Sequence, residues 1–277
     1  MIPVLVVSMN SDIERREAIS KKLTKFNIDY HFIDAVVGKN LSDDTLKDID
    51  ISKAQIRKQR YVSLGEIGCT LSHVKAYKYI INRSIPYCLI LEDDVIFDKQ
   101  FAEFVTCFNN SDLTGYGNDL VMLGGQNGID KSRFIARGFF KKIKIGNVLF
   151  AKTIKSDKFI FRTCCYVISL DIAQRLYDLS HKEFFIADEW SYFKSLGIFN
   201  NIYIADIVDH PLDLSNSHIE HERLNSISNF IPTEDNKGLK YKLEQYRLVK
   251  FAKVVLLLKV WKNMFLSARV FVRRLNL

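Results

Sequence analysis

Three consecutive carboxylates, Glu92-Asp93-Asp94, follow the apolar run at residues 87–91. Alternate side chains of a strand point to opposite faces, so Glu92 and Asp94 would share one face and Asp93 the other. Adjacent carboxylates raise one another's pKa, and a divalent cation removes that cost. Mg²⁺ and Mn²⁺ both take oxygen ligands. The run therefore predicts a metal site made by Glu92 and Asp94; a solvated turn or a helix cap is the alternative.

The residues that precede the acids have the pattern of a nucleotide-binding α/β sheet. Apolar residues 4–7 predict a strand, residues 10–26 a helix, and residues 30–34 a second strand. This strand–helix–strand start is typical of a parallel sheet. In an open α/β sheet, ligands bind beyond the carboxyl ends of the strands, and residues 92–94 lie at such an end.

The middle of the chain is less regular. Residues 37–60 are polar and charged without a clear period, and they predict a loop. Ser63 and Glu66 have the spacing of a capping box, which predicts the start of a helix. Residues 134–165 alternate apolar and basic side chains and predict β-hairpins. Asp171 is predicted to cap the helix that follows the next strand.

The composition is that of a globular protein with a substantial core. Of the 277 residues, 48% are hydrophobic and 26% are charged, with only four prolines. The five cysteines form no C-x-x-C pair, so we expect five free thiols that pack in the core. The apolar start at Met1 lacks the basic residues and the cleavage site of a signal peptide, so we expect a cytoplasmic protein.

The net charge of +8 comes from the end of the chain. Residues 240–277 hold ten Lys/Arg and one Glu, whereas the other 239 residues hold 30 basic and 31 acidic side chains. This distribution argues against nucleic-acid binding. We predict a folded domain at 1–238 and a basic, amphipathic helical tail at 239–277. The tail's apolar runs are shorter than the ~20 residues that span a bilayer, so it either lies on anionic lipid or packs on the domain.

Several motifs occur together in this chain. The most specific are Gly-Glu-Ile-Gly-Cys…Ser-His at 65–73 and Glu-Asp-Asp at 92–94. Others are found at residues 6–9, 14–16, 32–35, 89–91, 163–169, 188 and 217–223. Over roughly residues 2–225, the chain resembles glycosyltransferase family 25, the bacterial lipooligosaccharide and lipopolysaccharide transferases that are related to collagen galactosyltransferases.

The resemblance implies a fold and an activity. The fold would be GT-A-like: α/β, with a single Rossmann-type nucleotide-binding domain and a mostly parallel central sheet. The donor would be a UDP-sugar, usually UDP-galactose, and transfer would invert the anomeric carbon. The cofactor would be a divalent cation, Mn²⁺ or Mg²⁺. Glu92-Asp93-Asp94 looks like the family's version of the D-x-D metal motif.

Donor-binding roles follow for the matched positions near the first strands. Ser8 and Asp34, at the ends of the first two predicted strands, would contact the uridine and its ribose. Arg15 and Arg16 would pair with the diphosphate, or one of them would belong to a surface helix face. Asp93 would contact the ribose or anchor its loop.

The helix that follows the capping box supplies the remaining donor-binding candidates, which are Glu66, Ser72 and His73. Ser72 and His73 lie about 100° apart around a helix, so we expect only one of them to face the nucleotide. A satisfied core histidine is the alternative for His73.

An inverting transferase needs a base that takes the proton of the acceptor hydroxyl, and Asp188 is our candidate. It follows Phe184-Phe185-Ile186-Ala187, where apolar neighbours could raise a carboxylate's pKa. Relatives often have proline where this chain has Ile186, so Glu189 remains the alternative base. Trp190 could stack on a sugar, although core packing is the commoner fate of tryptophan.

The chain also departs from the family at Arg162, where relatives commonly carry glycine, so the acceptor is not carried over from the relatives. His210, His218 and His221 cluster near the end of the matched region. One of them could complete the metal site or contact a phosphate, and surface loop histidines are the alternative.

These observations predict an inverting hexosyltransferase that moves galactose onto a lipid-linked core oligosaccharide at the cytoplasmic face of the inner membrane. A metal-dependent nucleotidyltransferase or phosphohydrolase could use the same acids. A peripheral membrane adaptor, with structural acids and a functional tail, is the non-enzymatic alternative.

Overall fold

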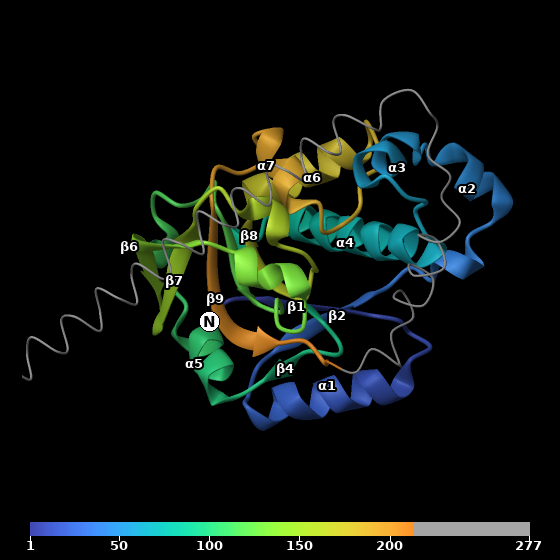
Figure 1. Cartoon of the computed structure of the whole chain (residues 1–277). Coiled ribbons are helices and arrows are strands. Elements are labelled where there is room, and N and C mark those ends of the chain that lie inside the picture. The colour runs from blue at the N-terminus through green and yellow to red at the C-terminus, as the bar shows by residue number, and fades with distance from the viewer. Residues whose placement is uncertain (213–277) are drawn as a thin grey trace, which may run out of the picture. The chain divides into compact units, whose positions relative to one another are not determined.

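The computed structural model describes residues 1–212 of the chain (Figure 1). The strands are β1 (Val4–Ser8), β2 (Tyr30–Asp34), β3 (Tyr87–Glu92), β4 (Ile96–Phe97), β5 (Leu120–Gly124), β6 (Arg137–Ile145), β7 (Val148–Thr153), β8 (Cys165–Ser169) and β9 (Ile202–Asp209). The α-helices are α1 (Ile13–Lys25), α2 (Asp43–Asp48), α3 (Ser52–Lys58), α4 (Leu64–Asn82), α5 (Lys99–Cys107), α6 (Leu170–Ser180) and α7 (Trp190–Ser195). Short 3₁₀ turns are η1 (Gly38–Asn40), η2 (Asn110–Leu113), η3 (Asp130–Phe134) and η4 (Asp157–Phe159).

The strands of the described residues form one mixed sheet in the order β2-β1-β3-β8-β5-β9-β7-β6, and β4 pairs with β9. Three pairings are parallel (β1 with β2, β1 with β3, β5 with β9), and the other five are antiparallel. The prediction of an α/β fold is confirmed, but the prediction of a mostly parallel sheet is wrong.

The reason for the mixed sheet is the route of the chain between its strands. Helix α1 connects β1 to β2, and a helical crossover of this kind makes neighbouring strands parallel. In contrast, β8 follows the β6–β7 hairpin and runs antiparallel to both of its neighbours, β3 and β5. The pairings still leave β1, β2, β3, β5 and β9 in one direction, so their carboxyl ends meet at one edge of the sheet.

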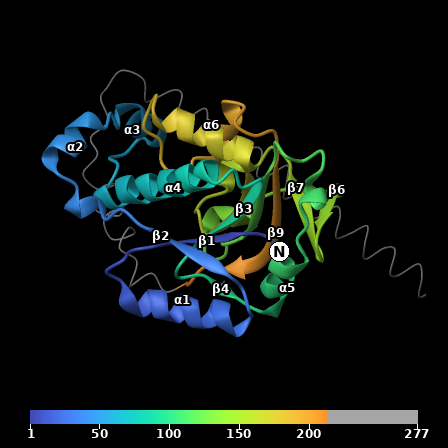
Figure 2. The same ribbon diagram turned by 180° about the vertical axis from the view of Figure 1, so that it is seen from behind.

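Helices cover both faces of this sheet (Figures 1 and 2). Along β1, Val4 and Val6 join the cluster that contains α1 and α5, whereas Leu5 and Val7 join the cluster that contains α4, α6 and α7. All four side chains are buried. This alternation is what a strand buried on both faces requires, and it explains why the first run is continuously apolar.

Helix α4 is held to the chain that follows β2 by a close backbone approach. A Cβ atom on Gly68 would lie 2.5 Å from the carbonyl oxygen of Val36 and 2.7 Å from the nitrogen of Gly38. Four residues later, the Ser72 hydroxyl accepts a hydrogen bond from the Val36 amide at 2.8 Å and donates one to the Gly68 carbonyl. The capping box predicted for Ser63 and Glu66 is confirmed at the start of this helix.

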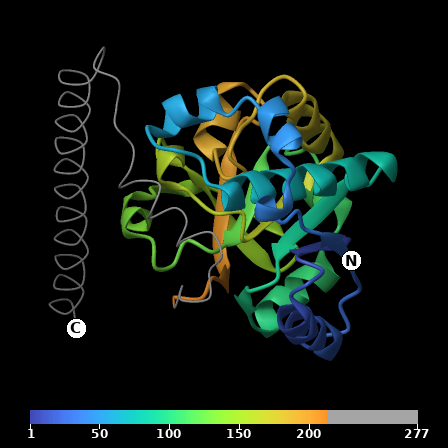
Figure 3. The same ribbon diagram turned by 90° about the vertical axis from the view of Figure 1, so that its right-hand side faces the viewer.

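Two sequence-based predictions of local structure are wrong. Residues 37–60, predicted as a loop, contain η1, α2 and α3, which lie on the α4 side of the sheet (Figures 1 and 3). These helices are too short to show a period, and in α3 only Ala54 is buried. Helix α6 is capped by Ser169, whose hydroxyl accepts from the Ile172 amide, rather than by Asp171, which lies in its first turn.

All five cysteines are free thiols, as predicted, although Cys107 is exposed rather than packed in the core. Within residues 1–212, the structure has no helix that is both long enough and apolar enough to cross a bilayer. The predicted domain boundary at 238 and the predicted tail at 239–277 lie outside the described residues.

Candidate functional site

The site lies where the first three strands of the sheet end. In the parallel register, Ser8 lies opposite Asp34, and Val7 lies opposite Glu92. Because all three strands run in the same direction, their last side chains come together at one edge. The predicted positions of Ser8, Asp34 and Glu92 at strand ends are therefore confirmed, while their roles in donor binding stay predictions.

The acidic run divides into two groups. Carboxylate oxygens of Glu92 and Asp94 lie within 4.8 Å of each other and of a ring nitrogen of His210. Asp93 instead lies against Arg15, with Nη1 3.2 Å from Oδ1. The pairing of Glu92 with Asp94 agrees with the alternation argument, although β3 ends at Glu92 and the next two acids form a turn.

His210 is fixed by the backbone around it. Its amide donates to Oδ1 of Asn127 at 2.8 Å, and its carbonyl accepts from Nδ2 of the same side chain at 2.7 Å. Its Nδ1 lies 2.8 Å from the Pro211 carbonyl, which can only accept, so Nδ1 carries the proton. In the neutral ring, Nε2 therefore keeps its lone pair, and it lies 3.9 Å from Oδ2 of Asp94.

Glu92, Asp94 and His210 fit a divalent cation. Two carboxylates and one imidazole are ligands that Mn²⁺ accepts. Oδ1 of Asp94 is buried and has no hydrogen-bond partner among residues 1–212, so a ligand for that oxygen is missing from the protein itself. His218 and His221, the other candidates from the sequence, lie outside the described part of the chain.

Glu92 and Asp94 have opposite pKa shifts. Burial acts to raise the pKa of Glu92, but the nearby His73, with smaller effects of Thr163 and His210, outweighs it and lowers that pKa. Burial raises the pKa of Asp94, and repulsion from Glu92 adds to the rise, against the opposing charges of His210 and Arg15. Burial also raises the pKa of Asp93, although Ser8 and Arg15 favour its charged form.

His73 lies behind Glu92, on the inner side of the site. Its ring is fully buried, with Nδ1 2.7 Å from the Tyr166 hydroxyl and Nε2 3.8 Å from Oε1 of Glu92. Cys69, one helical turn earlier on α4, joins His73 and Glu92 in a second group whose ligand atoms lie within 4.8 Å of one another. His73 is thus a core histidine that also faces the metal-site carboxylate.

Arg15 and Arg16 lie on α1 beside the strand ends. Nη1 of Arg15 lies 3.2 Å from Asp93 and 3.3 Å from Asp94, so its charge offsets that of the acidic run. Nη2 of Arg16 donates to the Asp34 carboxylate at 2.5 Å and to the Ser8 carbonyl at 2.9 Å. Both guanidinium groups therefore lie at the site, and neither belongs to a plain surface face.

Two consecutive residues connect Asp188 to the metal-site acids. The Arg162 amide donates to Oδ2 of Asp188 at 3.1 Å, and the Thr163 hydroxyl donates to Oε1 of Glu92. Nζ of Lys58 lies 3.6 Å from Oδ1 of Asp188. The apolar residues 184–187 before Asp188 are buried, and its carboxylate also lies against a cation and a backbone donor.

Arg162 has a backbone conformation that glycine favours. Its φ is 62°, in the left-handed region, which gives a physical reason for the glycine expected there. Its side chain donates to the carbonyls of Gly125 and Asn127, both at 2.9 Å. Arg162 thus connects the Asp188 segment to the loop that also holds His210.

Glu189 and Trp190, which follow Asp188, are occupied by the fold. Glu189 accepts two hydrogen bonds from Arg57, at 3.1 and 2.9 Å, and one from the Ile186 amide. Trp190 is fully buried, and its Nε1 donates to the Arg162 carbonyl. These contacts favour Asp188 over Glu189 as the base, and they place Trp190 in the core.

Glu66 and Ser72 of α4, which were predicted to bind the sugar-nucleotide donor, are also engaged by other residues of the protein. Glu66 is buried and forms a two-pronged ion pair with Arg60, at 2.7 and 2.5 Å, besides its capping hydrogen bond. Ser72 is buried in its contacts with Val36 and Gly68. Their donor-binding roles stay predictions that the observed contacts do not favour.

Two residues at the site were not among the candidates predicted from the sequence. Lys58 lies in the stretch predicted as a loop. That stretch contains several Lys and Arg residues, and nothing in the sequence distinguishes this one. Thr163 was part of a matched motif, but its contact with Glu92 depends on β8 pairing antiparallel with β3.

Comparisons with known proteins place this geometry in a family. The model of the family described as glycosyltransferase family 25 (LPS biosynthesis protein) matches residues 1–190. Human procollagen galactosyltransferase 2 is 29% identical over 178 residues, which are 62% of this chain and 27% of the relative. A glycosyltransferase 25 family member of Aedes aegypti is 30% identical over 125 residues, 44% of this chain and 21% of the relative.

The chain thus spans about a quarter of the length of these curated relatives. Among solved structures, a glycosyltransferase involved in the glycosylation of the major capsid of PBCV-1 has a TM-score of 0.35 and 8% identity, covering 79% of this chain and 98% of its own. That likeness is too low to support a conclusion.

A mixed α/β sheet with carboxylates and a histidine at the carboxyl ends of its strands defines an α/β protein whose polar residues gather where such sheets bind ligands. The family match is more specific, because it includes both motifs from the sequence. This chain belongs to glycosyltransferase family 25.

Proposed function

We propose that this protein is a metal-dependent, inverting hexosyltransferase that moves galactose from UDP-galactose onto the core oligosaccharide of a lipopolysaccharide or lipooligosaccharide. The family description supports the lipopolysaccharide pathway, and the name of the human relative supports galactosyl transfer. The observation that carries the proposal is the connection of Asp188 to Glu92 through the adjacent residues Arg162 and Thr163. It would hold the proposed base at a fixed position relative to the proposed metal site.

The cation would be held by Glu92, Asp94 and His210. When bound, Mn²⁺ or Mg²⁺ neutralises the charge of the departing diphosphate. The protein's own contribution is to fix these ligands: the Asn127 amide orients His210, and the Thr163 hydroxyl and His73 orient Glu92. Such supporting contacts determine how well ligands are prearranged for a metal.

The donor nucleotide would lie along the ends of β1 and β2. The Asp34 carboxylate is 61% exposed at the end of β2, where it can accept hydrogen bonds from ribose hydroxyls. Arg15, which pairs with Asp93 and Asp94, would supply positive charge to the diphosphate. Arg16 holds Asp34 and the Ser8 carbonyl, so its contribution is to position the ribose contact.

Asp188 would act as the general base. The acceptor hydroxyl oxygen bonds to the anomeric carbon as its proton passes to the carboxylate, and the bond from that carbon to UDP breaks on the opposite face. The Arg162 amide and Lys58 both favour the ionised carboxylate, which is the form that accepts a proton. Glu189 is held by Arg57 and cannot turn to the acceptor without losing that pair.

The experiment that tests the proposal is a screen for UDP release from different UDP-sugars, with truncated core oligosaccharides as acceptors. We expect acceptor-dependent UDP release from UDP-galactose, which EDTA stops and Mn²⁺ or Mg²⁺ restores. Release of pyrophosphate or inorganic phosphate instead would favour the nucleotidyltransferase or phosphohydrolase. No turnover with any sugar nucleotide would favour the non-enzymatic adaptor.

A further inference from the structure

The β6–β7 hairpin, which forms one end of the sheet, is strongly basic. Between Arg137 and Lys155 the chain carries six Lys/Arg and no Asp or Glu. In the part of the chain that the structure describes, no ion pair joins Lys141, Lys142 or Lys144 to a carboxylate. The hairpin therefore presents positive charge that the described residues leave uncompensated.

The same hairpin exposes large apolar side chains. Phe140 is 92% exposed and Phe139 68%, and their rings lie 4.9 Å apart at 85°. Leu149 and Ile154 on the β7 side are also about half exposed. Four large exposed hydrophobic side chains on one hairpin are typical of an interaction surface, because contact between apolar surface and water is unfavourable.

Two of the lysines share one face of the hairpin with an exposed leucine. Lys144 lies opposite Leu149 in the antiparallel register, and Lys142 lies opposite Ala151, so these side chains point to the same side. Nζ of Lys142 lies 5.5 Å from the ring centroid of Phe139. The ammonium group of Lys142 thus lies beside an exposed aromatic ring.

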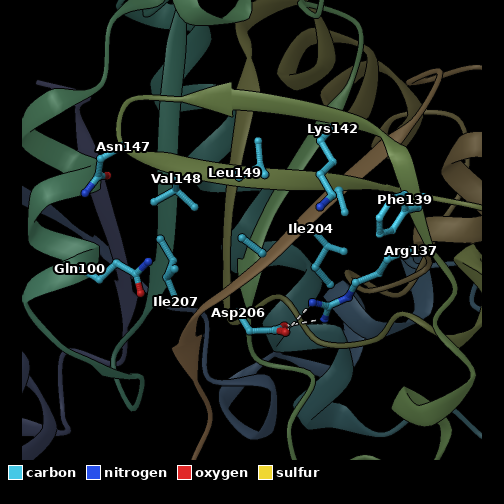
Figure 4. A pocket seen from close by; sticks show the side chains of 13 residues that line it. Gln100, Arg137, Phe139, Lys142, Asn147, Val148, Leu149, Ile204, Asp206 and Ile207 are labelled. Atoms are coloured by element: carbon cyan, nitrogen blue, oxygen red, sulfur yellow. Dashed lines mark hydrogen bonds and ion pairs between the residues drawn. The ribbon is translucent and has the colours of Figure 1, made fainter. Parts of the chain in front are cut away.

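A groove of about 630 Å³ continues this face onto β9 (Figure 4). Its lining includes Leu149, Ile204 and Lys142, with Asp206 as the one carboxylate among the lining residues. Asp206 is matched by Arg137, whose two terminal nitrogens donate to it at 2.5 and 2.7 Å (Figure 4). The groove therefore adds apolar surface without adding net negative charge.

We propose that the β6–β7 hairpin docks on an anionic lipid bilayer. Phe139, Phe140, Leu149 and Ile154 would enter the boundary between headgroups and acyl chains, and Lys141, Lys142 and Lys144 would contact lipid phosphates. A single-stranded nucleic acid fits less well: bases stack on aromatic faces, whereas the two Phe rings lie edge to face and the other exposed side chains are aliphatic. This proposal does not rest on the proposed enzymatic function.

A fluorescent probe on the hairpin tests the proposal directly. Phe140→Trp in a Trp261→Phe background leaves only one other indole, that of Trp190, which is fully buried. We expect vesicles of phosphatidylcholine with phosphatidylglycerol to shift the new emission to the blue, and brominated acyl chains to quench it. Pure phosphatidylcholine should do neither. Unchanged emission with anionic vesicles would overturn the proposal, whatever the rest of the chain binds.

Vesicle co-sedimentation of the full chain measures how much the lysine and phenylalanine side chains of the hairpin contribute to membrane binding. Each lysine near an anionic surface contributes about a five-fold change in partitioning, so Lys141→Gln with Lys142→Gln should weaken it about 30-fold. Lys21→Gln with Lys78→Gln removes the same charge elsewhere and should have a smaller effect. Phe139→Ser with Phe140→Ser should also weaken partitioning, whereas Ile56→Ser, at a site 74% exposed on α3, should not.

Equal losses for hairpin and control variants would contradict docking through the hairpin. Binding of a single-stranded RNA that depends on the same Phe and Lys residues, without vesicle binding, would assign the surface to nucleic acid instead. Circular dichroism of each variant establishes that its fold is retained.

Discussion

Nε2 of His210 lies 3.9 Å from Oδ2 of Asp94, while Nδ1 of the same ring is engaged by the Pro211 carbonyl at 2.8 Å. The carbonyl fixes the tautomer, so the lone pair of Nε2 lies on the side of the acids. His210 comes from the end of β9 and Asp94 from the turn after β3, more than a hundred residues earlier. The pairing of β4 with the end of β9, where Ile96 lies opposite Asp209, brings them together.

His210→Gln should therefore lower Mn²⁺ affinity by about 10- to 100-fold, because an amide replaces the imidazole ligand. Isothermal titration of the metal measures the change. His181→Gln, at an exposed histidine on the C-terminal side of α6, is the matched control and should leave affinity unchanged. Equal affinities for wild type and His210→Gln would exclude His210 as a ligand.

The opposite pKa shifts of Asp94 and Glu92 predict opposite effects on metal-free stability. The folded-state pKa of Asp94 is raised, so the folded state holds its proton more tightly and loses stability as pH rises through that pKa. Asp94→Asn should stabilise the protein in EDTA at neutral pH, and the gain should shrink as pH falls. The folded-state pKa of Glu92 is lowered, so its charge stabilises the fold above the unfolded value and Glu92→Gln should destabilise it.

Urea unfolding of the three proteins in EDTA, from neutral pH down to the acid range, measures these differences. A wild type more stable than Asp94→Asn at neutral pH would contradict the account. With saturating Mn²⁺ the order should reverse, because only the wild type gains the stability that comes with binding.

A substitution at Asp188 should affect catalysis, whereas a substitution at Glu189 should affect stability. Asp188→Asn should lower kcat by about 10²- to 10⁴-fold with little change in thermal stability, because it removes the base. Glu189→Gln should instead lower the free energy of unfolding by about 1–3 kcal/mol, because it weakens a buried pair with Arg57. The reverse assignment, with activity lost only in Glu189→Gln, would make Glu189 the base.

Arg162 combines an unfavourable backbone conformation with useful side-chain contacts. Arg162→Gly and Arg162→Ala lose the same hydrogen bonds to Gly125 and Asn127, but only glycine removes the cost of the left-handed φ of 62°. Arg162→Gly should therefore be more stable than Arg162→Ala by about 1 kcal/mol. Thermal unfolding measures the difference, and equal stabilities would show that the backbone conformation costs nothing.

Gly68 should tolerate no side chain, because a Cβ there would lie 2.5 Å from a backbone oxygen of Val36. Gly68→Ala should lower the free energy of unfolding by about 1–3 kcal/mol, although alanine normally favours a helix. Lys78→Ala on the exposed side of α4 is the control. A Gly68→Ala protein as stable as wild type would mean that the segment after β2 can move away from α4.

The strands nearest the site could be predicted because their patterns are local. Residues 4–7 and 87–91 are continuously apolar, as strands buried on both faces must be, and both became strands, the second with the acids at its end. The antiparallel insertion of β8 between β3 and β5 could not be predicted, because its own residues say nothing about which neighbours it pairs with.

The site was predictable to the extent that it lies within single motifs. Glu92 and Asp94 were grouped correctly, since they are two residues apart. His210 could be chosen among the three histidines only with knowledge of where β9 ends. Lys58 could be placed at the site only by predicting α3, a short helix whose sequence has no clear period. Ser72 is engaged by the Val36 amide, a long-range partner that the sequence does not specify, whereas Glu66 is engaged by the nearby Arg60.

Pulsed electron paramagnetic resonance of Mn²⁺ bound to the protein with UDP shows directly which side chains hold the cation. If Glu92, Asp94 and His210 hold a cation against the nucleotide, the spectrum should contain nitrogen coupling from one imidazole and phosphorus coupling from the diphosphate. His210→Gln should remove the nitrogen coupling alone. Bound Mn²⁺ that shows neither coupling in the wild type, or a nitrogen coupling that survives in His210→Gln, would contradict this account.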